Sequence, residues 1–351
     1  MRLISDAPLK MTWTEWCVSF LFPKILGYCW PKCDRSCIIS NPFRLLFTEN
    51  EFYQYCFDSQ KKKKKKKTQI MFDYHPISLE KVVSRIVSKV IANRLKTILP
   101  NVISDAQSAF VPNRLITNNT IVAFEVLHRM QNKRRGKRGW MAVKLDISKA
   151  YARVEWAFLR KVMLKRGLDE KWVKLAMETI CTATYSVLIN GEPKGFVTPT
   201  RGIKQGDPLS PFLFLFCAEG LSAMLRKAKE VRHLQGVLSR NGGVHISHLL
   251  FADDSLIFCQ ATIEECHRLL TILAQYEAAS GQAINRQKTT LFFSENTRFD
   301  VKHNIRNLMG ARIVEDCEKY LGLPMASGKS KVYTFKHLLN DHSPPSKFPL
   351  D

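Results

Sequence analysis

The sequence predicts an α+β fold in which a small antiparallel sheet carries helices on one face. Strand-like and helix-like segments alternate from Tyr74 onward, residues 81–95 carry apolar side chains at helical spacing, and two apolar runs close on a tight acidic turn at 251–254. Such alternation is typical of a mixed fold with a compact sheet. Further helices are expected at 120–130, 155–160, 212–229 and 263–279, and strands near 141–147, 185–190, 246–251, 255–259 and 289–293.

Local signals support these elements in order along the chain. Residues 81–95 alternate apolar and charged positions with the period of an amphipathic helix. The segment 141–147 is short and apolar, as expected of a buried strand. The strand at 185–190 runs into Asn190-Gly191, a dipeptide favoured in two-residue hairpin turns. Asp207-Pro208 precedes the helix at 212–229, and both residue types favour a first helical turn.

The acidic turn is the most informative local feature. Asp253 and Asp254 lie between the apolar runs 248–250 and 255–258, which predicts a β-hairpin with two carboxylates at its tip. Adjacent carboxylates repel each other, and a hard divalent cation such as Mg²⁺ takes oxygen ligands of this kind. The alternative is an ordinary turn without metal, since Asp is a common turn residue.

A second acidic position strengthens the metal interpretation. Asp146 ends the apolar segment 141–147, just before the helical residues 155–160. If the two strands are neighbours, Asp146, Asp253 and Asp254 could hold two metal ions about 4 Å apart, as polymerases and nucleases do. For Asp146 alone, the alternative is an N-cap of the following helix.

Three motifs in this order resemble the palm of a reverse transcriptase of the LINE-type (non-LTR) retrotransposon class, particularly its plant representatives. They are Lys144-Leu-Asp-Ile-Ser-Lys-Ala-Tyr151, Arg201-Gly-Ile-Lys-Gln-Gly-Asp-Pro-Leu-Ser-Pro211 and Phe251-Ala-Asp-Asp254. Flanking blocks resemble the same class: His75–Leu79, Gln107–Pro112, Ser280–Asn285 with Lys288, and Tyr320–Pro324. The resemblance spans about residues 72–325.

The resemblance implies a right-hand polymerase palm with partial fingers and a truncated thumb, acting as an RNA-directed DNA polymerase. Asp146, Asp253 and Asp254 would then be catalytic ligands of two Mg²⁺ ions, with Mn²⁺ as an alternative. A primer 3′-hydroxyl would attack the α-phosphorus of a dNTP. The partners would be an RNA template and a DNA primer, and no protein partner is predicted.

The same resemblance assigns further roles. Tyr151 would stack under the incoming sugar and exclude a 2′-hydroxyl, although a core aromatic is an equally simple interpretation. Gln205 and Gly206 would lie against the template and the nascent pair, where a residue without Cβ lets the backbone approach closely. Lys288 would stand near the triphosphate, or be a solvated loop lysine. Arg201 is assigned to nucleic-acid binding.

Composition favours a nucleic-acid partner. The formal net charge is +23, of which Lys61–Lys67 contributes seven charges. A dense basic run comprises Lys133, Arg134, Arg135, Lys137 and Arg138. A broad positive surface binds phosphate backbones without sequence preference. A solvated loop and a nuclear-import signal are the alternatives for this run. The apolar run 16–22 is too short to span a bilayer, and an intracellular, nuclear location is expected.

The chain divides unevenly. Residues 1–67 do not resemble the family, and with the Lys61–Lys67 run are expected to be disordered or a gene-model artefact. From the resemblance, residues 68–325 are expected to form the fingers and palm domain, and residues 326–351 are expected to be a truncated, disordered start of the thumb. Cys29, Cys33 and Cys37 lack a fourth metal-ligand pattern, so zinc is disfavoured.

Three departures from the family pattern bear on activity. His75 stands where the family usually has Arg, and Asn119 and Ala152 each stand where it usually has Asp. A neutral His binds phosphate less strongly than a permanently charged Arg. With the short fingers and thumb, these changes leave two hypotheses: an active polymerase domain, or an inactive retroelement remnant that at most binds nucleic acid. A group II intron maturase shares the palm, but Phe251 and the Ser280–Asn285 block resemble the LINE class more.

Overall fold

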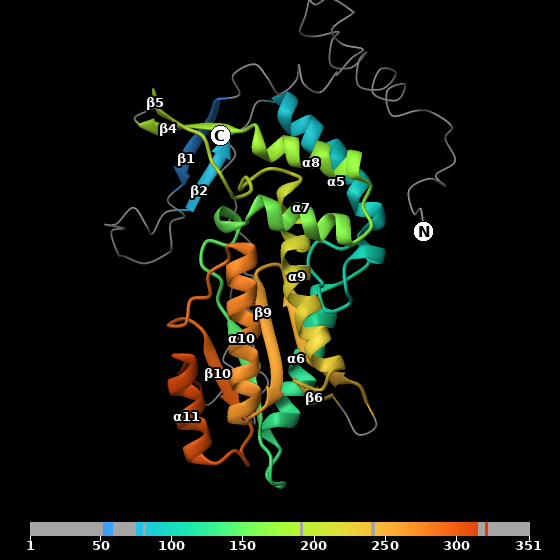
Figure 1. Ribbon diagram of the computed structural model, residues 1–351, viewed down its shortest axis with the longest axis vertical. Coiled ribbons are helices and arrows are strands. Elements are labelled where there is room, and N and C mark those ends of the chain that lie inside the picture. The colour runs from blue at the N-terminus through green and yellow to red at the C-terminus, as the bar shows by residue number, and fades with distance from the viewer. Residues whose placement is uncertain are drawn as a thin grey trace, which may run out of the picture. The chain divides into compact units, whose positions relative to one another are not determined.

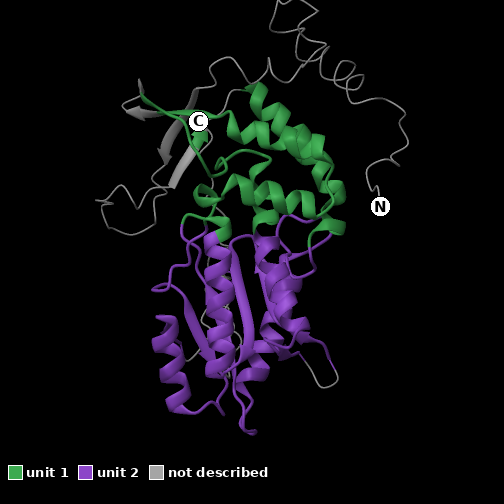
Figure 2. Ribbon diagram, viewed as in Figure 1, with its two compact units in different colours: residues 1–103, 149–217, 279–281 green, residues 104–148, 218–278, 282–351 purple. Residues whose placement is uncertain are grey.

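The computed structural model describes residues 52–58, 75–79, 82–189, 192–239, 243–314 and 320–321. The chain separates into two compact units, which Figure 2 shows in different colours. Unit 1 comprises residues 1–103, 149–217 and 279–281, and unit 2 comprises residues 104–148, 218–278 and 282–351. The predictions for residues 1–51, for Lys61–Lys67 and for residues 326–351 lie outside the described residues.

Unit 1 contains a four-stranded sheet in the order β2-β1-β4-β5. Strand β1 is antiparallel to β2 and parallel to β4, while β4 and β5 form the antiparallel pair expected around residues 190–191. These strands are β1 (Phe52–Asp58), β2 (His75–Leu79), β4 (Thr184–Ile189) and β5 (Glu192–Val197). No regular element was predicted for the segment that forms β1, because the sequence there lacks a clear period.

The helices of unit 1 are α5 (Val82–Val102), α7 (Trp156–Lys165) and α8 (Glu170–Cys181), and a short 3-10 turn η3 covers Tyr151–Arg153. Helices α7 and α8 lie against each other, and α5 contacts α8 (Figure 1). The sequence analysis did not predict α8, although Asp169 caps it by accepting hydrogen bonds from the backbone N–H groups of Lys171 (2.9 Å) and Trp172 (3.4 Å). Helix α9 (Ser210–Glu230) has residues in both units.

Unit 2 is built on a five-stranded sheet in the order β11-β10-β3-β9-β8. All its pairs are antiparallel except β10 with β11. The strands are β3 (Trp140–Leu145), β8 (His248–Phe251), β9 (Asp254–Gln260), β10 (Thr290–Phe293) and β11 (Arg312–Ile313), and a separate small pair is formed by β6 (Val237–Leu238) and β7 (His245–Ile246). This sheet contains the four strands predicted around the acidic residues.

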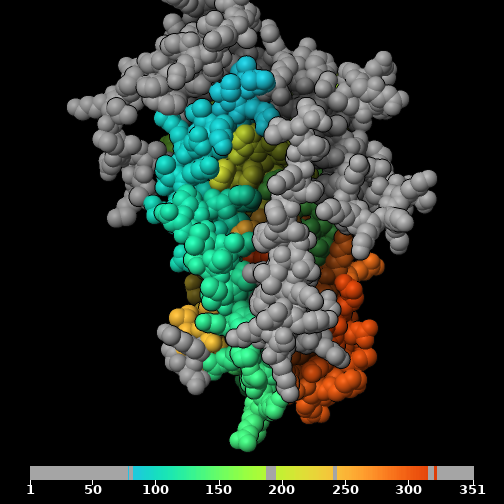
Figure 3. All heavy atoms as spheres, turned by 180° about the vertical axis from the view of Figure 1, so that it is seen from behind, coloured from blue at the N-terminus to red at the C-terminus, as the bar shows by residue number. Residues whose placement is uncertain are grey.

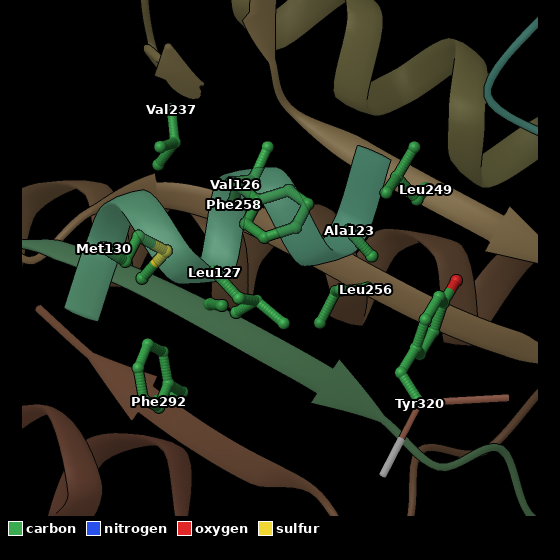
Figure 4. Packing of buried hydrophobic residues seen from close by; sticks show 11 residues of the cluster. Ala123, Val126, Leu127, Met130, Val237, Leu249, Leu256, Phe258, Phe292 and Tyr320 are labelled. Atoms are coloured by element: carbon green, nitrogen blue, oxygen red, sulfur yellow. The ribbon is translucent and has the colours of Figure 1, made fainter. Parts of the chain in front are cut away.

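Helices cover both faces of the unit 2 sheet, so the prediction of helices on one face was wrong. On one face, α6 (Ile116–Gln131) packs Leu127 into a core cluster with Ala142 (Figure 4). On the other, Leu145 lines a small cavity with Leu273 of α10 (Ile263–Ser280) and Met309 of α11 (Phe299–Met309). Residues 142 and 145 point to opposite faces of a strand. The central strands carry apolar side chains on both faces of the sheet, so both faces must pack against other elements to be shielded from water.

The α+β class is confirmed, and the differences lie in element boundaries. The helix predicted at 81–95 extends to Val102, the helix predicted at 120–130 begins at Ile116, and the strand predicted at 246–251 divides into β7 and β8. Helix α11 was not predicted, because it is polar overall and only Ile305 and Met309 are buried on it. Among the described helices, none has both the length and the apolar character required to cross a membrane.

Candidate active site

The predicted acidic hairpin is present in unit 2 and consists of β8, β9 and the turn between them. Phe251 pairs with Asp254, so Ala252 and Asp253 form a two-residue turn. Ala252 has φ of 53°, in the left-handed region that a residue with a Cβ rarely adopts. Asp253 is exposed and Asp254 is partly buried. Both carboxylates therefore lie at the end of the sheet, as the sequence predicts.

Asp146 comes from the neighbouring strand and reaches the same end of the sheet. Leu145 of β3 pairs with Ser255 of β9, so continuing the register by one residue puts Asp146 opposite Asp254. Directly opposed residues of an antiparallel pair point to the same face, with Cβ atoms about 5 Å apart. The structure thus brings together the carboxylates of Asp146 and Asp254 from two strands more than 100 positions apart in sequence.

The electrostatics of Asp254 reflect this convergence. Burial raises the pKa of Asp254 first, the negative charge of Asp253 raises it further, and that of Asp146 adds a smaller effect in the same direction. The ammonium group of Lys144 lowers the pKa in part. The charges of Asp253 and Asp146 therefore both act on Asp254, and a cation bound beside Asp254 would relieve the repulsion that raises its pKa.

The donor set suits a hard divalent cation, because all three side chains offer carboxylate oxygens. Within the described ranges, however, no group of three or more His, Cys, Asp or Glu side chains stands in a metal-binding arrangement. The strand register brings Asp146 and Asp254 together, and Asp253 stands on the exposed turn directly before Asp254.

Lys288 lies on a turn that is hydrogen-bonded to the Asp146 segment. The backbone N–H of Asn285 donates to the carbonyl oxygen of Asp146 at 2.8 Å, and the backbone N–H of Lys288 donates to the carbonyl oxygen of Asn285 at 3.2 Å. Ile147 and Ile284 form an antiparallel bridge beside them. The side chain of Lys288 is exposed. The turn that carries this cation is therefore joined through Asn285 to the backbone of Asp146.

In unit 1, Tyr151 begins the turn η3 and stacks on a buried aromatic ring. The ring centroids of Tyr151 and Phe214 are 5.1 Å apart, with an angle of 9° between the planes. The carbonyl oxygen of Tyr151 accepts a hydrogen bond from the backbone N–H of Ile203 at 2.9 Å. Tyr151 is only partly buried, so the stack supports the packing interpretation, and the sugar-binding role stays a prediction.

Gln205 and Gly206 lie on the loop before α9. Gly206 has φ of 102°, a conformation that favours glycine. The carbonyl oxygen of Gln205 accepts a hydrogen bond from the backbone N–H of Ser78 in β2 at 2.9 Å, which joins two of the blocks that resemble the family. Asp207 caps the following helix, since its Oδ2 accepts from the backbone N–H groups of Leu209 and Ser210, both at 2.9 Å.

Arg201 and Gly202 pack beside η3. A Cβ on Gly202 would lie 2.9 Å from the carbonyl oxygen of Ala152, and φ of Gly202 is 91°, so this close approach requires glycine. The family usually has Asp where this chain has Ala152. The close approach of Gly202 involves only backbone atoms of residue 152, so the change of side chain leaves it intact. The guanidinium of Arg201 forms an exposed ion pair with Glu155 at 3.5 Å.

Residues 133–138, named here the basic loop, lie in unit 2 between α6 and β3 and form a projecting tip in Figure 3. The amide nitrogen of Asn296 donates to the carbonyl oxygens of Arg135 (3.3 Å), Gly136 (2.9 Å) and Arg138 (3.1 Å). Arg134 forms an ion pair with Glu295 at 2.9 Å. The loop therefore has a defined backbone shape rather than being a freely solvated run.

The basic loop and the acidic hairpin lie at opposite ends of β3. The strand from Trp140 to Leu145 spans about 17 Å. At the basic end, the Lys133 ammonium lies 3.7 Å from the centroid of the Trp140 ring and the Arg129 guanidinium lies 5.8 Å from it. Burial, with a further contribution from Arg129, lowers the pKa of Lys133. Lys133 thus belongs partly to the packing, whereas Arg135, Lys137 and Arg138 are exposed.

Two buried amides contact the acidic hairpin: Gln107, to which no role was assigned from the sequence, and Asn119, noted above only as a departure from the family pattern. The side chain of Gln107 is fully buried and its Oε1 accepts the backbone N–H of Ala252 at 3.0 Å. Asn119 donates from Nδ2 to the carbonyl oxygen of Leu250 at 2.9 Å and accepts the Tyr320 hydroxyl at 3.0 Å. At position 119, an ionised Asp would lack the donor for Leu250, so Asn fits this chain. The resemblance of residues 107–112 to the family was the available signal for Gln107.

A larger hollow of about 710 Å³ lies between α7 and α8, with Arg160, Asp169 and Lys174 in its lining. None of the residues predicted from the sequence lines it, and its mixture of charges points to no single ligand.

Comparison with known proteins agrees with this arrangement. A family model described as reverse transcriptase (RNA-dependent DNA polymerase) matches residues 61–325. The chain is 50% identical over 76 residues to an uncharacterized mitochondrial protein of Arabidopsis thaliana, which covers 22% of this chain and 62% of that protein. It is 27% identical over 237 residues to an uncharacterized 149 kDa protein of transposon TX1 of Xenopus laevis, covering 66% of this chain and 17% of that protein.

A third relative is a retrovirus-related Pol polyprotein from the type-1 retrotransposable element R2 of Popillia japonica, 29% identical over 161 residues, covering 46% of this chain and 25% of the polyprotein. The chain spans less than two thirds of the length of each of these relatives. The family match covers more than half of the chain and includes all three acidic residues. The chain therefore belongs to the reverse transcriptase (RNA-dependent DNA polymerase) family, and its domain is of the LINE-type, non-LTR retroelement class.

Proposed function

We propose that this chain itself extends a DNA primer on an RNA template by adding nucleotides from dNTPs. The observation that supports this activity best is the placement of Asp146 opposite Asp254 at the end of the sheet, where the charges of Asp253 and Asp146 raise the pKa of Asp254. A polymerase needs carboxylates at one point to assemble the reacting phosphate and the primer end. Family membership then specifies the reaction class.

In this mechanism Asp146, Asp253 and Asp254 would hold two Mg²⁺ ions, or Mn²⁺ in their place. When bound, such ions activate the attacking hydroxyl and stabilise the departing pyrophosphate. Lys288, anchored through Asn285 to the Asp146 backbone, would neutralise charge on the triphosphate. The chain's own residues act mainly by positioning and charge compensation, as in other phosphoryl transfers.

Family membership would assign substrate contacts to Tyr151, Gln205, Gly206 and Arg201. The Tyr151 ring, fixed by its stack on Phe214, would exclude a ribose 2′-hydroxyl and so favour dNTPs. Gln205 and Gly206 would lie against the template, since the left-handed Gly206 presents backbone without a side chain. Arg201 would contact the phosphate backbone.

The basic loop would bind the backbone of the nucleic acid away from the reacting end. Its Arg135, Lys137 and Arg138 are exposed and their backbone is held by Asn296. Contacts of this kind carry no base sequence information and weaken with salt. The distance of about 17 Å along β3 indicates that this contact and the chemistry involve different parts of the substrate.

Primer extension by the full chain tests the proposal. Extension of a DNA primer on an RNA template in Mg²⁺ is expected for the parent and to be lost in Asp254→Asn. Asp300→Asn is the matched control, because Asp300 is an exposed carboxylate of the same unit that pairs with Arg298 on α11. Extension that survives Asp254→Asn would contradict the assignment of the acidic site.

A second candidate function is nucleic-acid binding without extension. It is favoured by the departures from the family pattern at His75 and Ala152. Fluorescence anisotropy with a labelled RNA–DNA hybrid separates the two candidates. Equal binding by the parent and Asp254→Asn, with no extension by either, would support the binding function and exclude the polymerase function for this chain.

A further inference from the structure

Gln107 is the buried polar residue in closest contact with the turn of the acidic hairpin. Its Oε1 accepts hydrogen bonds from two backbone N–H groups, those of Ala252 and Ala109, both at 3.0 Å. Its Nε2 donates to the carbonyl oxygen of Ala252 at 3.5 Å. The side chain is fully buried. One amide therefore contacts both backbone polar groups of Ala252, the residue between Phe251 and Asp253.

The residue that receives these bonds is the one in an unfavourable conformation. Ala252 has φ of 53°, and its Cβ makes the left-handed region costly for an L-residue. Asp253 follows directly, so the direction of its side chain depends on the backbone of Ala252. Hydrogen bonds to the Ala252 N–H and carbonyl oppose relaxation of this residue to negative φ, and would thereby hold the orientation of both aspartates.

Gln107 is itself held in place on the same edge of the sheet. The backbone N–H of Leu250 donates to the carbonyl oxygen of Ala106 at 2.7 Å, and that of Ser108 donates to the carbonyl oxygen of Leu250 at 3.1 Å. The carbonyl oxygen of Gln107 accepts from the guanidinium of Arg114 at 2.8 Å. The amide thus approaches the turn from a rigid segment, which is the condition for a residue that positions a site.

We infer that Gln107 is a positioning residue for catalysis: it holds Ala252 in the left-handed conformation that orients Asp253 and Asp254. The role rests on the proposed polymerase function and adds a residue that touches neither substrate nor metal. Asn119 supports the same hairpin two residues before Ala252, through the Leu250 carbonyl.

The central variant is Gln107→Met, which keeps the side-chain length while removing every hydrogen bond to Ala252. Without these bonds Ala252 would favour negative φ, and kcat for primer extension is expected to fall about 5- to 30-fold. KM for dNTP should change by less than about twofold, because no binding contact is removed. A second variant, Gln107→Glu, keeps the acceptor for the Ala252 N–H and is expected to lose less kcat.

Combining Gln107→Met with Ala252→Gly tests the role of the turn directly. Glycine enters the left-handed region without the Cβ penalty, so the double variant should regain most of the lost kcat. Thr297→Val is the matched control: it removes a buried hydroxyl that contacts Ser294 at 3.1 Å, in the same unit but at the basic-loop end of the sheet. Its kcat should equal that of the parent.

Amide hydrogen exchange, followed by mass spectrometry of a peptide covering residues 248–256, gives a readout independent of catalysis. Gln107→Met should speed exchange in this peptide, whereas Thr297→Val should not. Unchanged exchange and unchanged kcat in Gln107→Met would overturn the inference, as would equal losses in Thr297→Val or the absence of recovery with Ala252→Gly. A parent that fails to extend primers would refute the proposed function alone, while the exchange result would still decide whether Gln107 holds the turn.

Discussion

His248 should make the stability of this protein depend on pH, and the structure gives the size of the effect. The ring is buried and its two nitrogens face the hydroxyl groups of Ser222 and Ser247, each at 2.9 Å. Burial, with the positive charges of Arg226 and Lys229, lowers the pKa of His248 from 6.5 to about 4. The neutral ring is therefore the form that the folded protein accommodates.

The sign follows from proton linkage. Between pH 6.5 and pH 4 the His248 ring is protonated in the unfolded chain but neutral in the folded protein. Acidification through this window therefore favours unfolding. Above pH 6.5 the stabilising contribution is fully present. The full loss corresponds to about 3 kcal/mol, and roughly 2 kcal/mol of it is lost between pH 7 and pH 5.

Urea denaturation at pH 7 and pH 5, followed by circular dichroism, measures this loss. The full chain and His248→Gln should be compared, because glutamine can bond to both serines and does not titrate. The parent should lose about 2 kcal/mol more than His248→Gln between the two pH values. His303→Gln, at an exposed position of α11, should behave like the parent. Equal pH dependence in the parent and His248→Gln would refute the reasoning.

Three further predictions concern the loops around the candidate site. Gly202→Ala should destabilise the full chain by at least about 1–2 kcal/mol in urea denaturation, because φ is 91° and the new Cβ would meet the Ala152 carbonyl oxygen; unchanged stability would contradict the described approach. Asp207→Ala removes the cap of α9 and should cost about 1 kcal/mol in the same assay, while Asp207→Asn retains most of it. Arg135→Ala with Lys137→Ala should reduce the salt dependence of hybrid binding, lowering the slope of log affinity against log salt by about 1.5; an unchanged slope would remove the basic loop from the interface.

Short-range patterns explain what could be predicted from the sequence. The acidic hairpin was predicted because the apolar runs on both sides of Asp253 and Asp254 encode two strands and a turn within about ten residues. The start of α9 followed from Asp207-Pro208 in the same way. The position of Asp146 opposite Asp254 depended on the resemblance to a family, since strand pairing across so many residues leaves no local pattern.

What was missed depends mainly on tertiary contacts. The role of Gln107 arises from a bond to Ala252 across 145 positions, and no periodicity marks a buried amide in an irregular segment. Helix cover on both faces of the sheet could have been inferred from the sequence of β9, where residues 256–259 are apolar without alternation. Such a run is typical of a strand that is buried on both faces. The backbone of the basic loop is held by hydrogen bonds from Asn296, which lies 160 positions after Gly136 in the sequence. No local pattern in residues 133–138 indicates this partner.

The pairing of residues 106–108 with β8 also bears on self-association of the chain. Strand β8 is the last strand of its sheet, and an uncovered edge offers unpaired N–H and C=O groups to a strand of another chain. The bonds of Leu250 to Ala106 and Ser108 occupy those groups where the strand is most apolar. The segment that supports the acidic turn thereby closes an edge through which copies of the chain could otherwise add to one another. Substitutions that loosen it should therefore promote aggregation as well as slow any chemistry.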